Sequence, residues 1–151
     1  MSNYRRILSL DSAMVVVQFD KDGVQYQRKY FISYPDSVMV MKFTANQSGK
    51  QNLILSYCPN SEAKSNLRAD GKDGLVYTGV LDNNGMKFAF RIKAIHKGGT
   101  LEAENDRLIV KGADEVVFLL TADTDYKMNF NPDFKDPKTY VATIRNKPPE
   151  S

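Results

Sequence analysis

Residues 4–36, YRRILSLDSAMVVVQFDKDGVQYQRKYFISYPD, decide the fold that we expect for this chain. Apolar residues occupy every second position from Ala13 to Phe19, and polar residues such as Gln18 appear between them toward the end. A period of two is typical of a strand with one buried face. Residues 20–23, Asp-Lys-Asp-Gly, supply a tight turn, and residues 24–31 alternate again after it. The stretch therefore predicts an antiparallel hairpin that follows a further strand and ends at a proline-marked corner.

Short apolar runs separated by turn residues continue through the rest of the chain. The unbroken apolar centre of residues 115–122 predicts a fully buried central strand. The polar residues 59–74 predict the longest surface loop, broken by a short edge strand at Leu67–Ala69. Residues 87–95 alternate most regularly, with Phe88, Phe90, Ile92 and Ala94 expected on the inner face. Further strands are expected at residues 38–45, 53–57, 75–80, 100–104, 107–110 and 140–144.

The recurrence of turn signals defines the expected fold class. Their spacing is roughly the 8–12 residues typical of β-sandwiches. The sequence predicts an antiparallel, supersandwich-like β-sandwich of about ten short strands, with little or no helix. Residues 1–127 form the expected sandwich segment. Residues 128–151 are expected to hold a loop, the extra strand and a linker or tail.

Composition excludes several functional classes. The chain has 151 residues, which suits one domain, and its 21 Lys and Arg against 18 Asp and Glu give a net charge of +3. That charge is small and dispersed, so we expect no nucleic-acid partner. We find no apolar run long enough for a membrane span and no signal-peptide core in residues 1–20. With one cysteine, Cys58, the chain cannot form an internal disulfide.

Several motifs in order resemble the amino-terminal β-domain of glycoside hydrolase family 95, the α-L-fucosidase-type enzymes. The resemblance covers residues 4–127. In the first half it rests on Tyr4-Arg5-Arg6, Leu8-Ser9-Leu10-Asp11, Ala13, Asp22-Gly23-Val24, Arg28-Lys29-Tyr30-Phe31 and Ser33-Tyr34-Pro35-Asp36. In the second half it rests on Asn84–Phe88, Gly98-Gly99-Thr100, Leu108–Asp114 and Thr121–Lys127.

The resemblance implies an accessory, non-catalytic segment of a larger inverting enzyme. Such an enzyme would remove terminal α-linked fucose from glycans with water and no cofactor, although related members act on α-galactosides. Its catalytic residues would come from an α/α toroid of the same parent chain, which would be the partner of this segment. The resemblance also implies a periplasmic or secreted location in a bacterium. The glycine-rich and tryptophan-bearing segments that precede this region in the family are absent here.

Paired carboxylates are the residues that glycoside hydrolysis requires. The candidate pairs are Asp20 with Asp22, Glu102 with Glu104, Asp114 with Glu115, and Asp123 with Asp125. Each pair lies in a turn, on the solvent face of a strand, at a strand entrance or in a polar loop. We therefore favour structural roles and assign no catalytic residue to this chain.

His96 and Cys58 do not form a convincing reactive site. His96 ends a strand at a turn and is the only histidine, so a surface position is expected. Cys58 follows an apolar strand and is expected to pack as a small hydrophobe. Oxygen-bearing residues alternate in residues 123–133, but the glycine and the closing glutamate of a calcium loop are missing, so we expect no metal.

Exposed aromatics beside amides could bind a sugar. Tyr57 and Tyr77 could serve if they were exposed, but the best stretch lies near the C-terminal end. Its candidate contacts are Tyr126, Asn129, Phe130, Asn131, Asp133 and Phe134. The alternative, which we favour, is that these aromatics pin a loop to the core or to the toroid. A standalone carbohydrate-binding or structural interaction sandwich is the alternative function.

Overall fold

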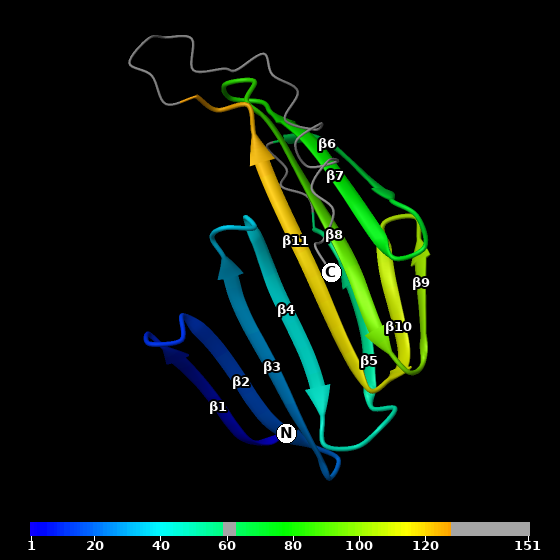
Figure 1. Ribbon diagram of the computed structural model, residues 1–151. Coiled ribbons are helices and arrows are strands. Elements are labelled where there is room, and N and C mark those ends of the chain that lie inside the picture. Colours follow the sequence, from blue (N-terminus) through cyan, green and yellow to red (C-terminus); the bar gives the residue numbers. More distant parts are fainter. Residues whose placement is uncertain (59–62, 128–151) are drawn as a thin grey trace.

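The computed structural model describes residues 1–58 and 63–127, and within them the chain is built from strands (Figure 1). This confirms the all-β class and gives eleven strands where about ten were expected. The described ranges contain no helix, and thus none with the length and apolarity needed to cross a membrane. The strands are β1 (Ser2–Ser9), β2 (Met14–Lys21), β3 (Val24–Ser33), β4 (Val38–Ala45), β5 (Gln51–Ser56), β6 (Ala63–Ala69), β7 (Gly74–Leu81), β8 (Lys87–Lys97), β9 (Thr100–Glu104), β10 (Arg107–Ala113) and β11 (Glu115–Thr124).

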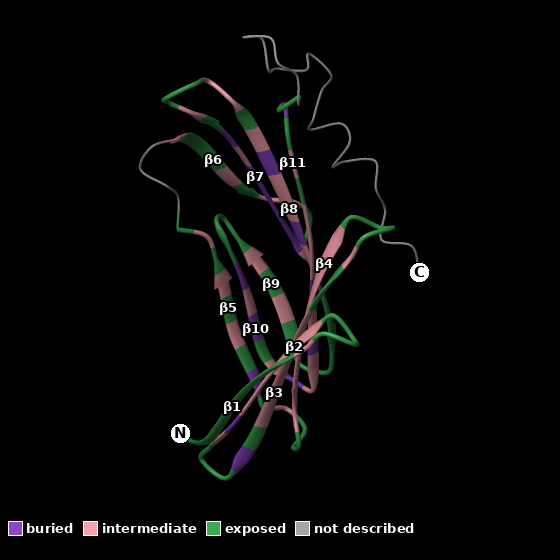
Figure 2. Cartoon of the chain, turned by 90° about the vertical axis from the view of Figure 1, so that its left-hand side faces the viewer, coloured by how far each residue is buried: buried purple, intermediate pink, exposed green. Residues whose placement is uncertain are grey.

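The strands form two antiparallel sheets of unequal width. The large sheet has eight strands in the order β1-β2-β3-β4-β11-β8-β7-β6, and the small sheet has three in the order β5-β10-β9. In Figure 1 the small sheet lies behind one half of the large sheet, and Figure 2 shows the two layers from the side. β11 pairs with β4 on one side and with β8 on the other, so it joins the two halves of the large sheet.

The predicted hairpin is confirmed as β2 and β3. Lys21 pairs with Val24, which leaves a loop of two residues, Asp22 and Gly23. Both loop residues have positive φ, 54° and 74° respectively. Positive φ at both central residues defines the type I′ turn, whose twist matches that of antiparallel strands, and Gly23 adopts it without steric cost. The Asp-Gly dipeptide therefore fixes the register of this hairpin.

The hydrophobic core lies between the small sheet and half of the large one. Leu108 and Val110 of β10 are almost completely buried, as are Leu75 of β7 and Val116 and Phe118 of β11. Partly buried side chains of β4, β5, β6 and β9 surround them. In the described residues this core cluster takes no member from β1, β2 or β3.

The first three strands, which we call the wing (residues 2–33), contribute few buried side chains. None of the residues of β1 is buried. The buried apolar side chains of the wing are Phe19 and Val24, near the hairpin turn. Among the described residues, eight of the twelve exposed large apolar side chains occur between Met1 and Tyr34. The wing is therefore a continuation of the large sheet beyond its core.

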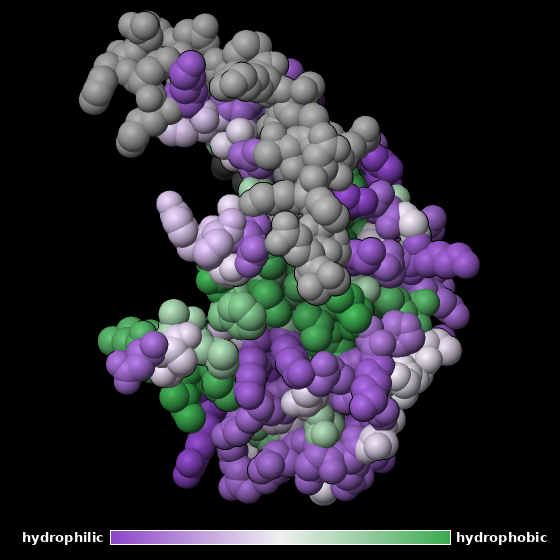
Figure 3. Space-filling view, viewed as in Figure 1, coloured by the Kyte–Doolittle hydropathy of each residue, from purple (hydrophilic) through white to green (hydrophobic). Residues whose placement is uncertain are grey.

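The prediction of a fully buried central strand is half right. β11 is central, and its Val116 and Phe118 are buried, but Val117 and Leu119 on the opposite face are only half-buried. Figure 3 shows apolar side chains gathered on this outer face over the middle of β4, β11 and β8. Full burial is wrong because, in the described part of the chain, the second sheet covers one face only.

Two other local predictions are refined. The expected edge strand at residues 67–69 is β6, which is longer because its ladder with β7 extends back to Ala63. The alternation in β8 is confirmed by the burial of Ile92 and Ala94, and Phe90 packs against the core. The predicted strand at residues 140–144, and the whole of residues 128–151, lie outside the described residues.

Candidate functional site

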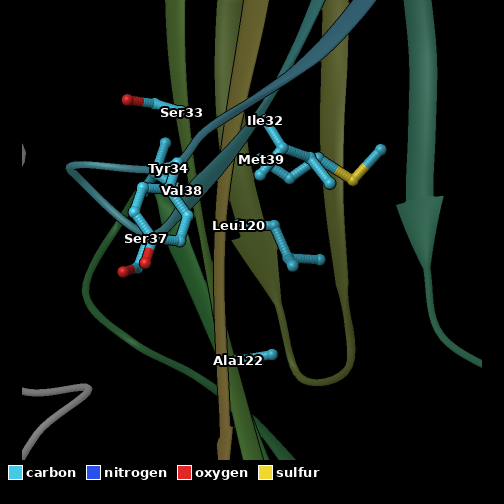
Figure 4. Close-up of a pocket in the computed structure, with 8 residues that line it drawn as sticks. All are labelled: Ile32, Ser33, Tyr34, Ser37, Val38, Met39, Leu120 and Ala122. Atoms are coloured by element: carbon cyan, nitrogen blue, oxygen red, sulfur yellow. The ribbon is translucent and has the colours of Figure 1, made fainter.

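A shallow hollow of about 310 Å³ opens beside the turn that joins β3 to β4 (Figure 4). The register places Ile32, Met39 and Leu120 next to one another on the face that carries the core. Figure 4 shows Met39, Leu120 and Ala122 projecting to the same side, so these side chains form an apolar floor. The hollow is lined by Ile32, Ser33, Tyr34, Ser37, Val38, Met39, Leu120 and Ala122.

The rim of this hollow is aromatic and hydroxylic. Tyr34, which supplies the aromatic ring, is 92% exposed as a residue. The corner is shaped by the backbone N–H of Ser37, which donates to the Tyr34 carbonyl at 3.2 Å, and by the Ser33 hydroxyl, which donates to the Asp36 carboxylate. An exposed ring above an apolar floor can contact the apolar face of a sugar or of a side chain. The lining residues include no Asp, Glu or His, so they offer neither a carboxylate nor an imidazole for acid–base chemistry.

The first candidate carboxylate pair belongs to the β2–β3 hairpin. Asp20 accepts a hydrogen bond from the Asn3 amide at 2.6 Å. Asp22 is the first residue of the type I′ turn. Asp22 thus agrees with the turn interpretation, whereas Asp20 lies within β2, opposite Gln25, and the expectation that it forms the turn is wrong.

The second pair, Glu102 and Glu104, lies on the exposed face of β9. Glu104 forms an ion pair with Arg107 across the β9–β10 turn, with 3.4 Å between the charged groups. The two carboxylates thus share a solvent-facing side of an edge strand, as the alternation predicts.

The remaining two pairs stabilise the ends of β11. At its start, Asp114 accepts from the Gly49 N–H at 2.8 Å, and Glu115 pairs with Lys42 at 2.6 Å. At its end, Asp123 accepts from the Thr124 N–H at 2.8 Å. The buried Asp125 accepts from the Lys87 N–H at 2.8 Å and donates its own N–H to the Lys87 carbonyl at 3.1 Å. Asp125 thereby ties the end of β11 to the start of β8.

His96 lies where the sequence predicts, and Cys58 does not. The Nδ1 atom of His96 is 2.8 Å from the Gly98 carbonyl oxygen at an exposed turn. Cys58 is exposed, so the prediction that it packs as a small hydrophobe is wrong. Along residues 53–58 the shielded side chains alternate, with Tyr57 half-buried, and Cys58 falls on the solvent side of this alternation.

Of the sugar-contact candidates near the C-terminal end, Tyr126 lies in the described residues. This residue is 54% exposed, and its backbone N–H donates to the Thr124 hydroxyl at 3.3 Å. Within residues 1–58 and 63–127, no three His, Cys, Asp or Glu side chains gather in a way that could hold a metal. Asn129, Phe130, Asn131, Asp133 and Phe134 lie outside the described residues.

Sequence reasoning missed the hollow and an aromatic cluster. The ring of Tyr77 packs on Tyr57 and Phe90, with centroids 4.3 and 4.8 Å apart. The Tyr77 hydroxyl is buried without a hydrogen-bond partner among the described residues. The pairing of Tyr77 with Phe90 could have been foreseen from the β7–β8 hairpin, whereas the hollow depends on β11 lying beside β4.

Residues 1–129 match the profile of a family described as "Glycosyl hydrolase family 65, N-terminal domain". The chain belongs to this family. The expected kind of domain is confirmed, but the family number is corrected from 95 to 65. The motifs behind the expectation are strand and turn sequences, which specify a sandwich fold better than they specify one family among those that share it.

Curated relatives of this family 65 N-terminal domain include two proteins named as fucosidases. "Probable alpha-fucosidase A" of Aspergillus niger is 28% identical over 137 residues, which cover 84% of this chain and 16% of that protein. "Alpha-L-fucosidase 2" of Arabidopsis thaliana is 24% identical over 147 residues, which cover 83% of this chain and 17% of that protein. The chain thus spans about a sixth of the length of these relatives.

A solved structure supports the fold of the domain. "Putative kojibiose phosphorylase from human microbiome" superposes with a TM-score of 0.61 over 95% of this chain and 21% of its own chain. At 9% sequence identity this likeness concerns the fold alone.

Proposed function

We propose that this domain is an accessory, non-catalytic β-sandwich segment of an α-L-fucosidase-like glycoside hydrolase acting on terminal fucose of glycans. The observation that carries the proposal is the alignment of more than four-fifths of the chain with two proteins named as fucosidases. The described carboxylates support it, because at least one member of each candidate pair makes a hydrogen bond or ion pair with a neighbouring strand or turn.

Catalysis in this proposal belongs to the remainder of a longer parent polypeptide. An inverting enzyme holds its two carboxyl groups roughly 6.5–9.5 Å apart, with room for the attacking water. The parent would supply that pair, together with the partner surface for this domain, from an α/α toroid.

The test is hydrolysis of 4-nitrophenyl α-L-fucoside by the parent polypeptide and by this chain alone. We expect turnover by the parent and none by the chain, with the β-configured product released first as judged by NMR. The corresponding α-galactoside is the control substrate. Hydrolysis by the isolated chain, or a parent that cleaves only the galactoside, would contradict the proposal.

Carbohydrate binding is the second candidate function, and the exposed ring of Tyr34 beside the apolar hollow favours it. We expect L-fucose or a fucosylated oligosaccharide to perturb the NMR signals of Tyr34, and we expect Tyr34→Ala to abolish the effect. Tyr126→Ala is the matched control, since it removes another exposed ring. Binding that survives Tyr34→Ala but not Tyr126→Ala would move the site to the end of β11.

A further inference from the structure

The two layers of the sandwich differ in width, and the difference leaves the wing without a facing sheet. Adjacent strands lie about 4.8 Å apart, so three strands span far less than eight. The main contacts between the layers join β10 to β7 and β8, and β5 to β4. β5 is the edge of the small sheet, and it therefore lies at the boundary between the covered half and the wing.

The register identifies the inner face of the wing. Val17 pairs with Arg6 on one side and Arg28 on the other, and this row continues into Phe43 and the buried Val116. Cross-strand partners share a face of the sheet. The inner face of the wing is thus the same face that forms the core further along the sheet.

A second row on this face is apolar. Val15 pairs with Leu8 and Tyr30, and the row continues through Met41 to the buried Phe118. Leu8 is 64% exposed, although it occupies the same row as Phe118, which is 2% exposed. The row therefore changes from core to surface where the small sheet ends.

Two arginines interrupt this apolar face. The guanidinium carbon of Arg28 lies 5.1 Å from the centre of the Phe19 ring and 5.5 Å from that of Phe43. Such cation–π contacts hold the guanidinium plane over the face but do not neutralise its charge. Among the described residues neither Arg6 nor Arg28 has an ion-pair partner. The paired positions on this face contain no Asp or Glu; they are Arg6, Leu8, Val15, Val17, Phe19, Lys21, Val24, Tyr26, Arg28, Tyr30 and Ile32.

We propose that further β-strands of the parent polypeptide, from outside this chain, cover the inner face of the wing. These strands extend the small sheet from the free edge of β5 and present at least one carboxylate to Arg28 and Arg6. This proposal rests on the proposed function, because both require that this chain is part of a longer parent polypeptide.

Added strands of the parent polypeptide are the favoured occupant because they continue the small sheet and can bring negative charge to the two arginines. A strand added beside β5 continues an existing layer about 10 Å from the large sheet, which is the ordinary separation in a sandwich. A second copy of the chain is a poorer partner, because the inner face of its own wing would bring arginines and no carboxylate to the interface. Unpaired charges that lose their hydration destabilise an interface.

Hydrogen–deuterium exchange on the isolated chain and on the parent polypeptide tests the inference. We expect the amides of β2 and β3 to exchange at least tenfold more slowly in the parent than in the isolated chain. The same slowing is expected for the amides of β5 that do not bond to β10. Equal rates in the two proteins would overturn it. If the wing of the isolated chain exchanges slowly and light scattering shows that the chain is a dimer, the choice of occupant would be overturned.

Charge reversal tests the predicted carboxylate. In the parent, Arg28→Glu is expected to return the wing to the fast exchange of the isolated chain. Arg6→Glu, at an exposed position, does the same without disturbing the aromatic contacts of Arg28. Lys29→Glu is the matched control, since Lys29 is the next residue of β3 and faces the opposite side of the sheet. If both arginine variants keep the protection, the predicted ion pair is wrong.

The hydrogen-exchange experiment and the hydrolysis experiment can fail independently of each other. A parent with a protected wing but no fucosidase activity would overturn the proposed function and support this inference. An active fucosidase with an unprotected wing would overturn this inference and support the proposed function.

Discussion

The core half of the large sheet and the wing are made of similar strands in different surroundings. In the core half, β11 and β8 alternate between buried and half-exposed residues because the small sheet covers one face. In the wing, β2 and β3 carry comparable runs of Val, Tyr and Phe, yet most of these side chains are only half-buried. The comparison shows that the period of a strand predicts which residues share a face, whereas burial of that face depends on a second layer.

The largest expected difference between the two regions comes from truncating one aromatic ring in each. Phe118 and Tyr30 lie in the same cross-strand row, but Phe118 is 2% exposed and Tyr30 is half-buried. We expect Phe118→Ala to lower the free energy of unfolding by about 3–5 kcal/mol, which is the usual cost of emptying a core position. Tyr30→Ala should cost about 1 kcal/mol, near the average for point mutants.

Urea denaturation followed by circular dichroism measures both variants. Equal losses would mean that the wing is covered even in the isolated chain. A Phe118→Ala protein that keeps nearly its full stability would contradict the position of the core.

A glycine in each region provides the next comparison. Gly99, in the β8–β9 turn, has φ 63°, and an added Cβ would clash with the Lys111 carbonyl oxygen. Gly23, in the wing turn, has φ 74° and open space around its missing Cβ. Gly23→Ala should cost about 1–2 kcal/mol, the price of a left-handed backbone for a residue with a side chain. Gly99→Ala should cost more than that, because the backbone must also shift.

Thermal unfolding of the two alanine variants ranks the two glycines. Equal melting temperatures for Gly99→Ala and Gly23→Ala would show that the close approach at Gly99 is relieved without loss of stability.

The smallest expected effect concerns the ion pair at the junction of the two regions. Lys42 of β4 and Glu115 of β11 lie 2.6 Å apart, with side chains 41% and 36% exposed. Water and salt screen such a pair, so Glu115→Gln should lower the free energy of unfolding by only about 0.2–1 kcal/mol. The loss should shrink further in 1 M salt, where the screening length is about 3 Å. A salt-independent loss above about 2 kcal/mol would imply that this pair is shielded from solvent.

Local sequence patterns predicted the hairpins well, because their information is local. The Asp-Gly turn, the alternation of β8 and the exposed turn at His96 all depend on neighbours along the chain. The exposure of Cys58 was available from the same kind of pattern, since the alternation of β5 continues through Tyr57 to the solvent side.

Long-range pairing limits what the sequence could predict. The pairing of β11 with β4 brings Leu120 beside Met39 and forms the hollow, and no local pattern encodes it. The half-exposed face of Val117 and Leu119 was misjudged for a related reason. An apolar run shows that two faces are apolar, but not that two layers cover them.

The central position of β11 also determines the order in which the large sheet can be completed. β1 to β4 form one consecutive antiparallel set and β6 to β8 another, and in the described residues their ladders are joined through β11. During synthesis at about 5–20 residues per second, both sets emerge from the ribosome before the strand that connects them. While Glu115–Thr124 are still inside the ribosome, the nascent chain therefore carries two separate meanders. Each of them has an open edge that will later pair with β11.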